Sequence, residues 1–157
     1  MKTMYVQEGD IATDFKLQAS DGSTVKLISF RGQKNVILCF YPKNHLFACP
    51  SKMVFKMAQS TISVYPQIMD LGSVLFAISI DTVEDQRKFV EEYHIPYLHI
   101  SDPKKETSKI YARLNIAGLA KRSTFIVNKE GKIAKIFRKV NVDMHGQEIL
   151  DALKNLK

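Results

Sequence analysis

Two apolar runs joined by a helical stretch constrain this chain most. Residues 35–42, NVILCFYP, and 73–80, SVLFAISI, are almost continuously hydrophobic, which is typical of strands covered on both faces of a sheet. The stretch between them is predicted to become helical after Pro50, to be interrupted or kinked near Pro66 and to end at Gly72. Its apolar positions are Met53, Val54, Met57, Ile62 and Val64. Two buried strands joined by a helix begin a βαβ pattern.

Short alternating segments precede this unit. Residues 15–20 and 24–30 alternate between apolar and polar side chains on either side of Asp21-Gly22. This pattern predicts a β-hairpin, because glycine supplies the positive φ that a tight turn needs.

The remaining elements continue the pattern. Asp81 and Glu84 form a capping box that predicts a helix over 82–93, and a short strand follows at 97–101. Asp102-Pro103 predicts the start of a third helix. Residues 123–127 and 132–137 predict a second hairpin, and a last helix follows. Each of these two helices has apolar residues on one face. They are Ile110, Tyr111 and Leu114 in the third helix, and Ile149, Leu150, Leu153 and Leu156 in the last.

The order β-β-β-α-β-α-β-α-β-β-α predicts an α/β fold, a mixed central β-sheet flanked by helices with an N-terminal β-hairpin. With 157 residues, 45% of them hydrophobic, the chain suits one domain over 1–157. Ligands of such folds gather at the carboxyl ends of the strands. The segment 39–51, CFYPKNHLFACPS, follows one such end.

Hydropathy and charge indicate which classes of partner the protein can have. The N-terminus lacks the apolar run of a signal peptide, and no segment approaches the roughly 20 apolar residues of a membrane span, so we expect a cytoplasmic protein without a membrane partner. The net charge is +7 with a pI near 9.4. Because the basic residues are scattered along the chain, we expect no nucleic-acid partner.

Cys49 is the first candidate for chemistry. A cysteine just before Pro50, where a helix is expected to begin, would experience the positive end of the helix dipole and the free N–H groups of the first turn. Both would lower the thiol pKa from about 8.5 toward neutrality. A free cysteine also often serves as a small buried hydrophobic residue, and position alone leaves both interpretations open.

Cys39 is expected in the core. It lies within the apolar run VILCFY, where burial raises a thiol pKa and hinders approach. Two cysteines are too few for a disulfide framework. Cys39 is therefore not expected to act as a resolving cysteine for Cys49.

The residues around Cys49 resemble the active-site loop of the peroxiredoxins, the AhpC/TSA family of thiol peroxidases. The similarity continues through EGDIATDF, DGSTVKL, FRGQKNVILCFYP, SVLFAISID, ISDP and RSTFIVNKEGKI, in the order found in the family. Length and ending are most similar to the bacterioferritin-comigratory, or Q-type, branch. The resemblance implies a thioredoxin-like fold.

The resemblance also implies site roles. Cys49 occupies the peroxidatic position, Pro42 the proline that shields it, and Arg122 the active-site arginine. The implied reaction reduces hydrogen peroxide or organic hydroperoxides and oxidises Cys49 to sulfenic acid. A thioredoxin-type dithiol reductase is not indicated, because the chain has no C-x-x-C motif and no proline immediately before residue 123.

One position departs from the family pattern P-x-x-x-T/S-x-x-C. Leu46 stands where a threonine or serine is expected, and leucine cannot form a hydrogen bond through its side chain. His45 and Ser51 are the neighbouring polar residues that could substitute, although we expect His45 to face solvent and Ser51 to cap the helix. Reduced activity is therefore expected.

The chain also departs from the Q-type branch at the position of the resolving cysteine, which would reduce the oxidised Cys49. Where the Q-type branch often carries a resolving cysteine, this chain has Val54. The resemblance therefore implies a one-cysteine type without a cofactor, recycled by an external thiol reductant such as a thioredoxin or glutaredoxin-like protein, and acting as a monomer or homodimer.

Aromatic residues surround the cysteine loop. Phe40, Tyr41 and Phe47 are expected to line a pocket that shields the thiol and limits peroxide entry, together with Leu46 and Pro50. The histidines offer no metal site, because the spacing of His45, Cys49, His94 and His99 matches no zinc pattern, and His94 and His99 are expected as turn or strand residues.

Three functional hypotheses follow. The first is a thiol-dependent peroxidase. The second is a peroxiredoxin-like sensor or binding protein in which Cys49 oxidises slowly, and Leu46 is the residue that favours it. The third is a basic scaffold domain without a redox role.

Overall fold

A five-stranded mixed sheet forms the centre of the computed structural model, which describes residues 5–46, 49–50 and 52–156. Its strand order is β7-β6-β3-β8-β9. The three strands β3, β6 and β7 are parallel, whereas β8 and β9 are antiparallel to their neighbours. The strands span Asn35–Phe40 (β3), Ser73–Ser79 (β6), His99–Ser101 (β7), Ser123–Val127 (β8) and Ile133–Phe137 (β9).

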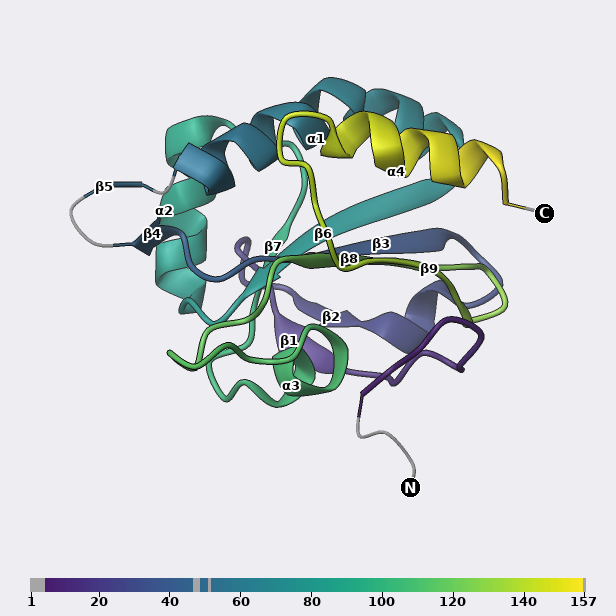
Figure 1. Ribbon diagram of the computed structural model, residues 1–157, viewed down its shortest axis with the longest axis horizontal. Helices are drawn as coiled ribbons and strands as arrows, with labels where there is room; N and C mark the ends of the chain where they lie inside the picture. The colour runs from purple at the N-terminus through teal and green to yellow at the C-terminus, as the bar shows by residue number, and fades with distance from the viewer. Residues whose placement is uncertain (1–4, 47–48, 51, 157) are drawn as a thin grey trace.

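Layers cover both faces of this sheet (Figure 1). On one face lie α1 (Lys52–Asp70), α2 (Val83–Tyr93) and α4 (His145–Lys154). On the other lie the hairpin of β1 (Lys16–Gln18) and β2 (Thr24–Lys26), the 3₁₀ helix η1 (Leu27–Phe30) and α3 (Glu106–Tyr111). The α/β class, the N-terminal hairpin and the mixed sheet are confirmed.

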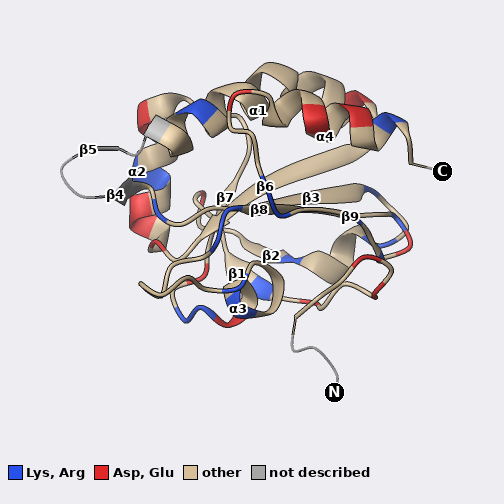
Figure 2. Ribbon diagram, viewed as in Figure 1, with Lys and Arg blue, Asp and Glu red and all other residues tan. Residues whose placement is uncertain are grey.

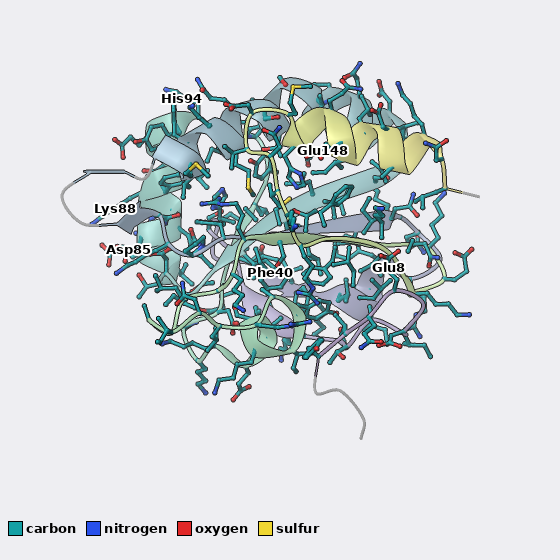
Figure 3. The ribbon with its side chains drawn as sticks, in the orientation of Figure 1. Glu8, Phe40, Asp85, Lys88, His94 and Glu148 are labelled. Carbon is teal, nitrogen blue, oxygen red and sulfur yellow. The ribbon has the colours of Figure 1, made fainter. Side chains whose placement is uncertain are left out.

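Two apolar clusters, one on each face, explain why β3 and β6 are hydrophobic throughout. In β3, Ile37 and Cys39 face α1 and α4, whereas Leu38 and Phe40 face the N-terminal layer. Side chains alternate between the faces of a strand, so a strand covered on both sides needs apolar residues at every position. Figure 3 shows Phe40 inside the fold, while Asp85 and Lys88 extend outward from α2.

The helix α1 differs from the sequence prediction in two ways. It begins at Lys52, two residues after Pro50, and it continues through Pro66 to Asp70 without a break. Proline inside a helix costs about 3 kcal/mol because it removes a hydrogen bond and crowds the preceding turn. Tyr65 and Ile68 are buried on either side of Pro66, and their packing offsets this cost.

Two other helices begin later than predicted. The cap of α2 is Thr82, whose side chain accepts a hydrogen bond from Asp85 N, rather than Asp81. The third helix begins at Glu106, because Lys105 adopts a left-handed conformation with φ 65°. Asp102 still caps this helix, because its carboxylate accepts a hydrogen bond from Ser108 N in the first turn at 2.7 Å. The Asp81 carboxylate, in contrast, accepts from Asn44 N and leaves the capping of α2 to Thr82.

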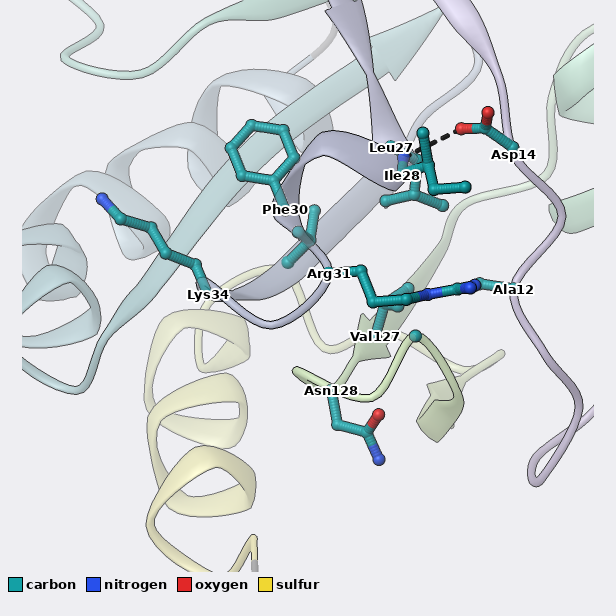
Figure 4. A pocket seen from close by; sticks show the side chains of 11 residues that line it. Ala12, Asp14, Leu27, Ile28, Phe30, Arg31, Lys34, Val127 and Asn128 are labelled. Carbon is teal, nitrogen blue, oxygen red and sulfur yellow. Dashed lines mark hydrogen bonds between the residues drawn. The ribbon is translucent and has the colours of Figure 1, made fainter.

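The turns of both hairpins follow the prediction. Gly22 has φ 85° between β1 and β2, and Gly131 has φ 84° between β8 and β9, values that glycine adopts without strain. The Arg31 side chain packs directly over Gly131, where an added Cβ would lie 2.4 Å from Arg31 Nε. This contact borders a small cavity beside η1, in which Asp14 accepts a hydrogen bond from Ile28 N (Figure 4).

Basic residues occur in every layer and do not concentrate on one element (Figure 2). This distribution agrees with the scattered pattern in the sequence. Among the described helices, none combines the length and the hydrophobicity needed to cross a membrane.

Candidate functional site

The candidate site lies at the end of the sheet where β3 stops and β8 starts. Phe40 pairs with Ser123 in the antiparallel register, so Tyr41 leaves β3 where Arg122 leads into β8. The chain then continues from Tyr41 into two short strands, β4 (His45–Leu46) and β5 (Cys49–Pro50). Residues 81 positions apart in sequence, Tyr41 and Arg122, thus meet at the carboxyl end of the central strand.

Cys49 lies in a β-ribbon and not in the first turn of a helix. In the antiparallel pair β4-β5, Leu46 is opposite Cys49 and His45 is opposite Pro50. The ribbon lies at the periphery, near the start of α1 (Figure 1). The expectation that Cys49 precedes a helix beginning at Pro50 is wrong, because α1 begins at Lys52. Phe47 and Ser51 lie outside the described residues.

Arg122 is half-buried beside α1. Its Nη1 donates a hydrogen bond to Met57 Sδ at 3.4 Å, and thioether sulfur is a weak acceptor. Burial lowers the pKa of Arg122, yet a guanidinium stays charged at neutral pH. Among the described side chains, Arg122 forms no ion pair. Its positive charge is therefore not neutralised by any of the described carboxylates.

A small cavity adjoins this guanidinium. Its volume is about 10 Å³, which is close to the space that one water molecule needs. Polar groups from different elements line it beside an apolar wall. The lining consists of Tyr41, Val54, Met57, Ala58, Ala77, Phe89, Tyr97, His99 and Arg122.

A buried hydrogen-bond network begins at the same cavity. The Tyr41 hydroxyl donates to Asn44 Oδ1 and contacts His99 Nδ1 at 2.8 Å. Asn44 Nδ2 donates to Gln86 Oε1 at 3.0 Å. Asn44 N donates to Asp81 Oδ2 at 2.9 Å. The network connects the loop after β3 to β6, α2 and β7, and so fixes the backbone that leads toward Cys49.

Three members of this network, Asn44, Gln86 and His99, were not identified from the sequence. Gln86 lies three residues before the buried Phe89 on α2, and it is itself fully buried. His99 is the first residue of β7 and lies two residues after Tyr97, and both side chains are buried. Polar residues at apolar positions of a periodic pattern were the available signal. His94 occupies a turn as expected, as the left-handed C-cap of α2.

The predicted aromatic pocket is only partly correct. Tyr41 lines the cavity with Arg122. Phe40 does not, because it points to the opposite face of the sheet and stacks on Tyr111 with ring centroids 5.6 Å apart. Alternation along the strand separates the two neighbours. Pro42 is half-buried at the start of the loop.

Cys39 lies in the core, as expected. Its side chain is 1% exposed, and burial raises the pKa of the thiol to about 12. Such a thiol remains protonated at physiological pH and is a poor nucleophile. No group of three or more potential metal ligands occurs within the described parts of the chain.

Comparison with known proteins extends these observations. The model of the AhpC/TSA family matches residues 9–136. The chain is 31% identical to "Peroxiredoxin Bcp" of Bacillus subtilis over 98% of both sequences. It is 30% identical to a "Putative peroxiredoxin bcp" of Coxiella burnetii, covering 96% of this chain and all of the relative.

Solved structures agree in fold. The crystal structure of peroxidoxin BcpB from Mycobacterium tuberculosis superposes with a TM-score of 0.84 at 23% identity, covering 98% of this chain and 99% of the other. A cysteine-to-serine mutant of PrxQ from Xylella fastidiosa gives a TM-score of 0.86 at 20% identity, covering 96% of both chains. With the family match, this likeness confirms the thioredoxin-like peroxiredoxin fold. The chain therefore belongs to the AhpC/TSA family of thiol peroxidases, in the Bcp/Q-type branch of the peroxiredoxins.

Proposed function

We propose that this protein reduces hydrogen peroxide or organic hydroperoxides through Cys49. The observation that carries the proposal is the half-buried guanidinium of Arg122, which has no carboxylate partner among the described side chains and lies at the sheet end from which the chain runs into the Cys49 ribbon. A fixed positive charge favours the thiolate and stabilises negative charge on a departing oxygen. Family membership supports the same assignment.

The proposed reaction has two stages. The Cys49 thiolate attacks one peroxide oxygen, so an S–O bond forms while the O–O bond breaks. The departing oxygen takes up a proton and leaves as water or an alcohol, and Cys49 becomes sulfenic acid. An external thiol then attacks the sulfenic sulfur and releases water, and a second thiol reduces the resulting mixed disulfide.

The burial of Cys39 and the residue at position 54 support a one-cysteine cycle. Cys39 is sealed in the core with a pKa of about 12, and Val54 occupies the position of the resolving cysteine of the Q-type branch. We therefore propose an external reductant of the thioredoxin or glutaredoxin type. The single domain over 1–157, the cytoplasmic location and a monomeric or homodimeric state remain part of this proposal.

The second candidate is a peroxiredoxin-like sensor. It is favoured by Leu46, which pairs with Cys49 in the ribbon and offers no hydroxyl there. In this case Cys49 would oxidise too slowly for turnover and would report oxidation to a partner.

Rapid mixing of the reduced Cys39→Ser variant with hydrogen peroxide separates the two candidates. We expect Cys49 to form a sulfenate, trapped with dimedone, much faster than free cysteine does. Arg122→Met should slow this step, whereas Arg87→Met, which removes an exposed arginine of α2, should not. Oxidation at the rate of free cysteine would contradict the peroxidase and support the sensor.

A further inference from the structure

The donor and the acceptor of each hydrogen bond in the buried network around Tyr41 can be assigned. Gln86 Nε2 donates to the Ile100 carbonyl oxygen at 3.1 Å and to Ser79 Oγ at 2.8 Å. A carbonyl only accepts, so the amide nitrogen of Gln86 must face β7 and its oxygen must face Asn44. Asn44 therefore presents Nδ2 to Gln86 Oε1, and its own oxygen to Tyr41.

These assignments fix the tautomer of His99. Tyr41 has one hydroxyl proton and donates it to Asn44 Oδ1, which is nearer than the other acceptor, Gln86 Oε1 at 3.0 Å. His99 Nδ1, which lies 2.8 Å from the Tyr41 hydroxyl and 3.3 Å from Gln86 Oε1, then faces oxygen atoms that can only accept. Nδ1 must carry the proton, and Nε2 is left with a free lone pair.

Nε2 of His99 lies inside the fold without a protein partner. The residue is 2% exposed, and no described group is within hydrogen-bonding reach of this nitrogen. Buried polar atoms are normally hydrogen-bonded. His99 and Arg122 line the same cavity of about 10 Å³, and a guanidinium carries five N–H donors. A side chain with an unpartnered acceptor and a side chain with several donors therefore line one space about the size of a water molecule.

We propose that one water molecule in this cavity accepts a hydrogen bond from Arg122 and donates one to His99 Nε2, making His99 a positioning residue for Arg122. The bonds then run in one direction from Arg122 through the water, His99, Tyr41, Asn44, Gln86 and Ser79. They end at the Asp81 carboxylate, which accepts from Ser79 Oγ at 2.5 Å. Chains of aligned hydrogen bonds strengthen one another.

This series of hydrogen bonds restrains the Arg122 guanidinium at a second point. The described protein bond of Arg122 goes only to Met57 Sδ, a weak acceptor that restrains its direction little. A link through His99 would hold its position, without placing a carboxylate beside it that would cancel its charge. The kinetic consequence rests on the proposed function, whereas the tautomer and the water do not.

The direct test uses the unaltered protein. Long-range ¹H–¹⁵N NMR should show neutral His99 with its proton on Nδ1, and a high-resolution crystal structure should show a water within hydrogen-bonding distance of His99 Nε2 and an Arg122 nitrogen. A proton on Nε2, or a cavity without this bridging water, would overturn the inference whether or not the protein reduces peroxide.

The kinetic test is a double-mutant cycle. His99→Leu should lower kcat/KM for peroxide about two- to tenfold, as expected for one neutral hydrogen bond. In an Arg122→Met background the same substitution should have almost no further effect, because His99 acts through Arg122. An undiminished effect in that background would overturn the positioning role.

Thr61→Val is the matched control for the kinetic test. It removes a buried hydroxyl from α1 that contacts Tyr97 Oη at 2.7 Å, outside the proposed chain. It should lower stability while leaving kcat/KM unchanged. An equal loss of kcat/KM in Thr61→Val and His99→Leu would reduce the effect to general destabilisation and overturn the proposal.

Discussion

Leu46 stands where the family pattern P-x-x-x-T/S-x-x-C has threonine or serine. It pairs with Cys49 across the β4-β5 ribbon, so its position in the fold is adjacent to the proposed nucleophile. A hydrogen bond to a charged group contributes about 1.5–3 kcal/mol. A chain with leucine here lacks that contribution to the transition state.

Leu46→Thr should therefore raise kcat/KM for hydrogen peroxide by about ten- to a hundredfold, because the new hydroxyl could hydrogen-bond to the reacting groups. Steady-state assays with a thiol reductant would measure this. Leu46→Val is the control, since it has the branched shape of threonine without the hydroxyl. Equal rates for the threonine and valine variants would show that the hydroxyl is not what limits the reaction.

At this scale, the sequence predicted residues that belong to a motif and missed those that depend on packing. Pro42, Cys49 and Arg122 were predicted as site residues because they occupy fixed positions in a family pattern, and their roles stay predictions. His99 was not, because its role arises only when β7 brings it beside Tyr41 and Gln86. No spacing along the chain records that contact.

At the scale of elements, α1 and α4 approach each other closely at Gly146 and Ser60. Gly146 N donates to Ser60 Oγ at 2.8 Å, and an added Cβ on Gly146 would lie 2.1 Å from the Ser60 carbonyl oxygen. Both groups belong to helices, so neither can move without shifting an element. Glycine is required here for a close approach.

Gly146→Ala should lower the free energy of unfolding by about 1 to 3 kcal/mol, the range typical of overpacking. Chemical denaturation followed by circular dichroism would measure the loss. Gln147→Ala, at the exposed next position, should change stability by less than about 0.5 kcal/mol. If the two variants were equally stable, the helices could separate more easily than their contact implies.

Element types followed from periodicity, and element boundaries did not. The hairpins and the βαβ unit were predicted because apolar alternation and continuous apolar runs reflect burial directly. The starts of α1, α2 and α3 were predicted too early. In α2, the aspartate expected to cap the helix, Asp81, instead accepts a hydrogen bond from Asn44 N. In α3, Asp102 does accept from the first turn, at Ser108 N, although the helix begins only at Glu106.

At the scale of the whole molecule, burial of neutral histidines links stability to pH. Burial lowers the pKa of His99 from 6.5 to about 3. It also lowers the pKa of His145, which lies between Thr124 and Glu148. Between the folded and unfolded pKa values, the unfolded chain binds protons that the folded chain does not. Falling pH therefore favours unfolding.

The urea midpoint should fall as the pH is lowered from 7 toward 4, inside the window between a pKa of 6.5 and one of about 3. The His99→Leu variant should show a shallower pH dependence than the unaltered protein, whatever its stability at pH 7. A parallel dependence in the two proteins would mean that His99 does not contribute to acid sensitivity.

The burial of Cys39 determines which disulfides this protein can form and how it returns to the reduced state. On the proposed mechanism, a folded molecule has one thiol that can enter a disulfide, so every disulfide it forms joins it to a second molecule. Its return to the reduced state is then a bimolecular event, whose frequency depends on how abundant the reductant is. Oxidised protein would accumulate whenever peroxide arrives faster than such encounters occur, and the size of that pool would measure the balance between oxidant and reductant.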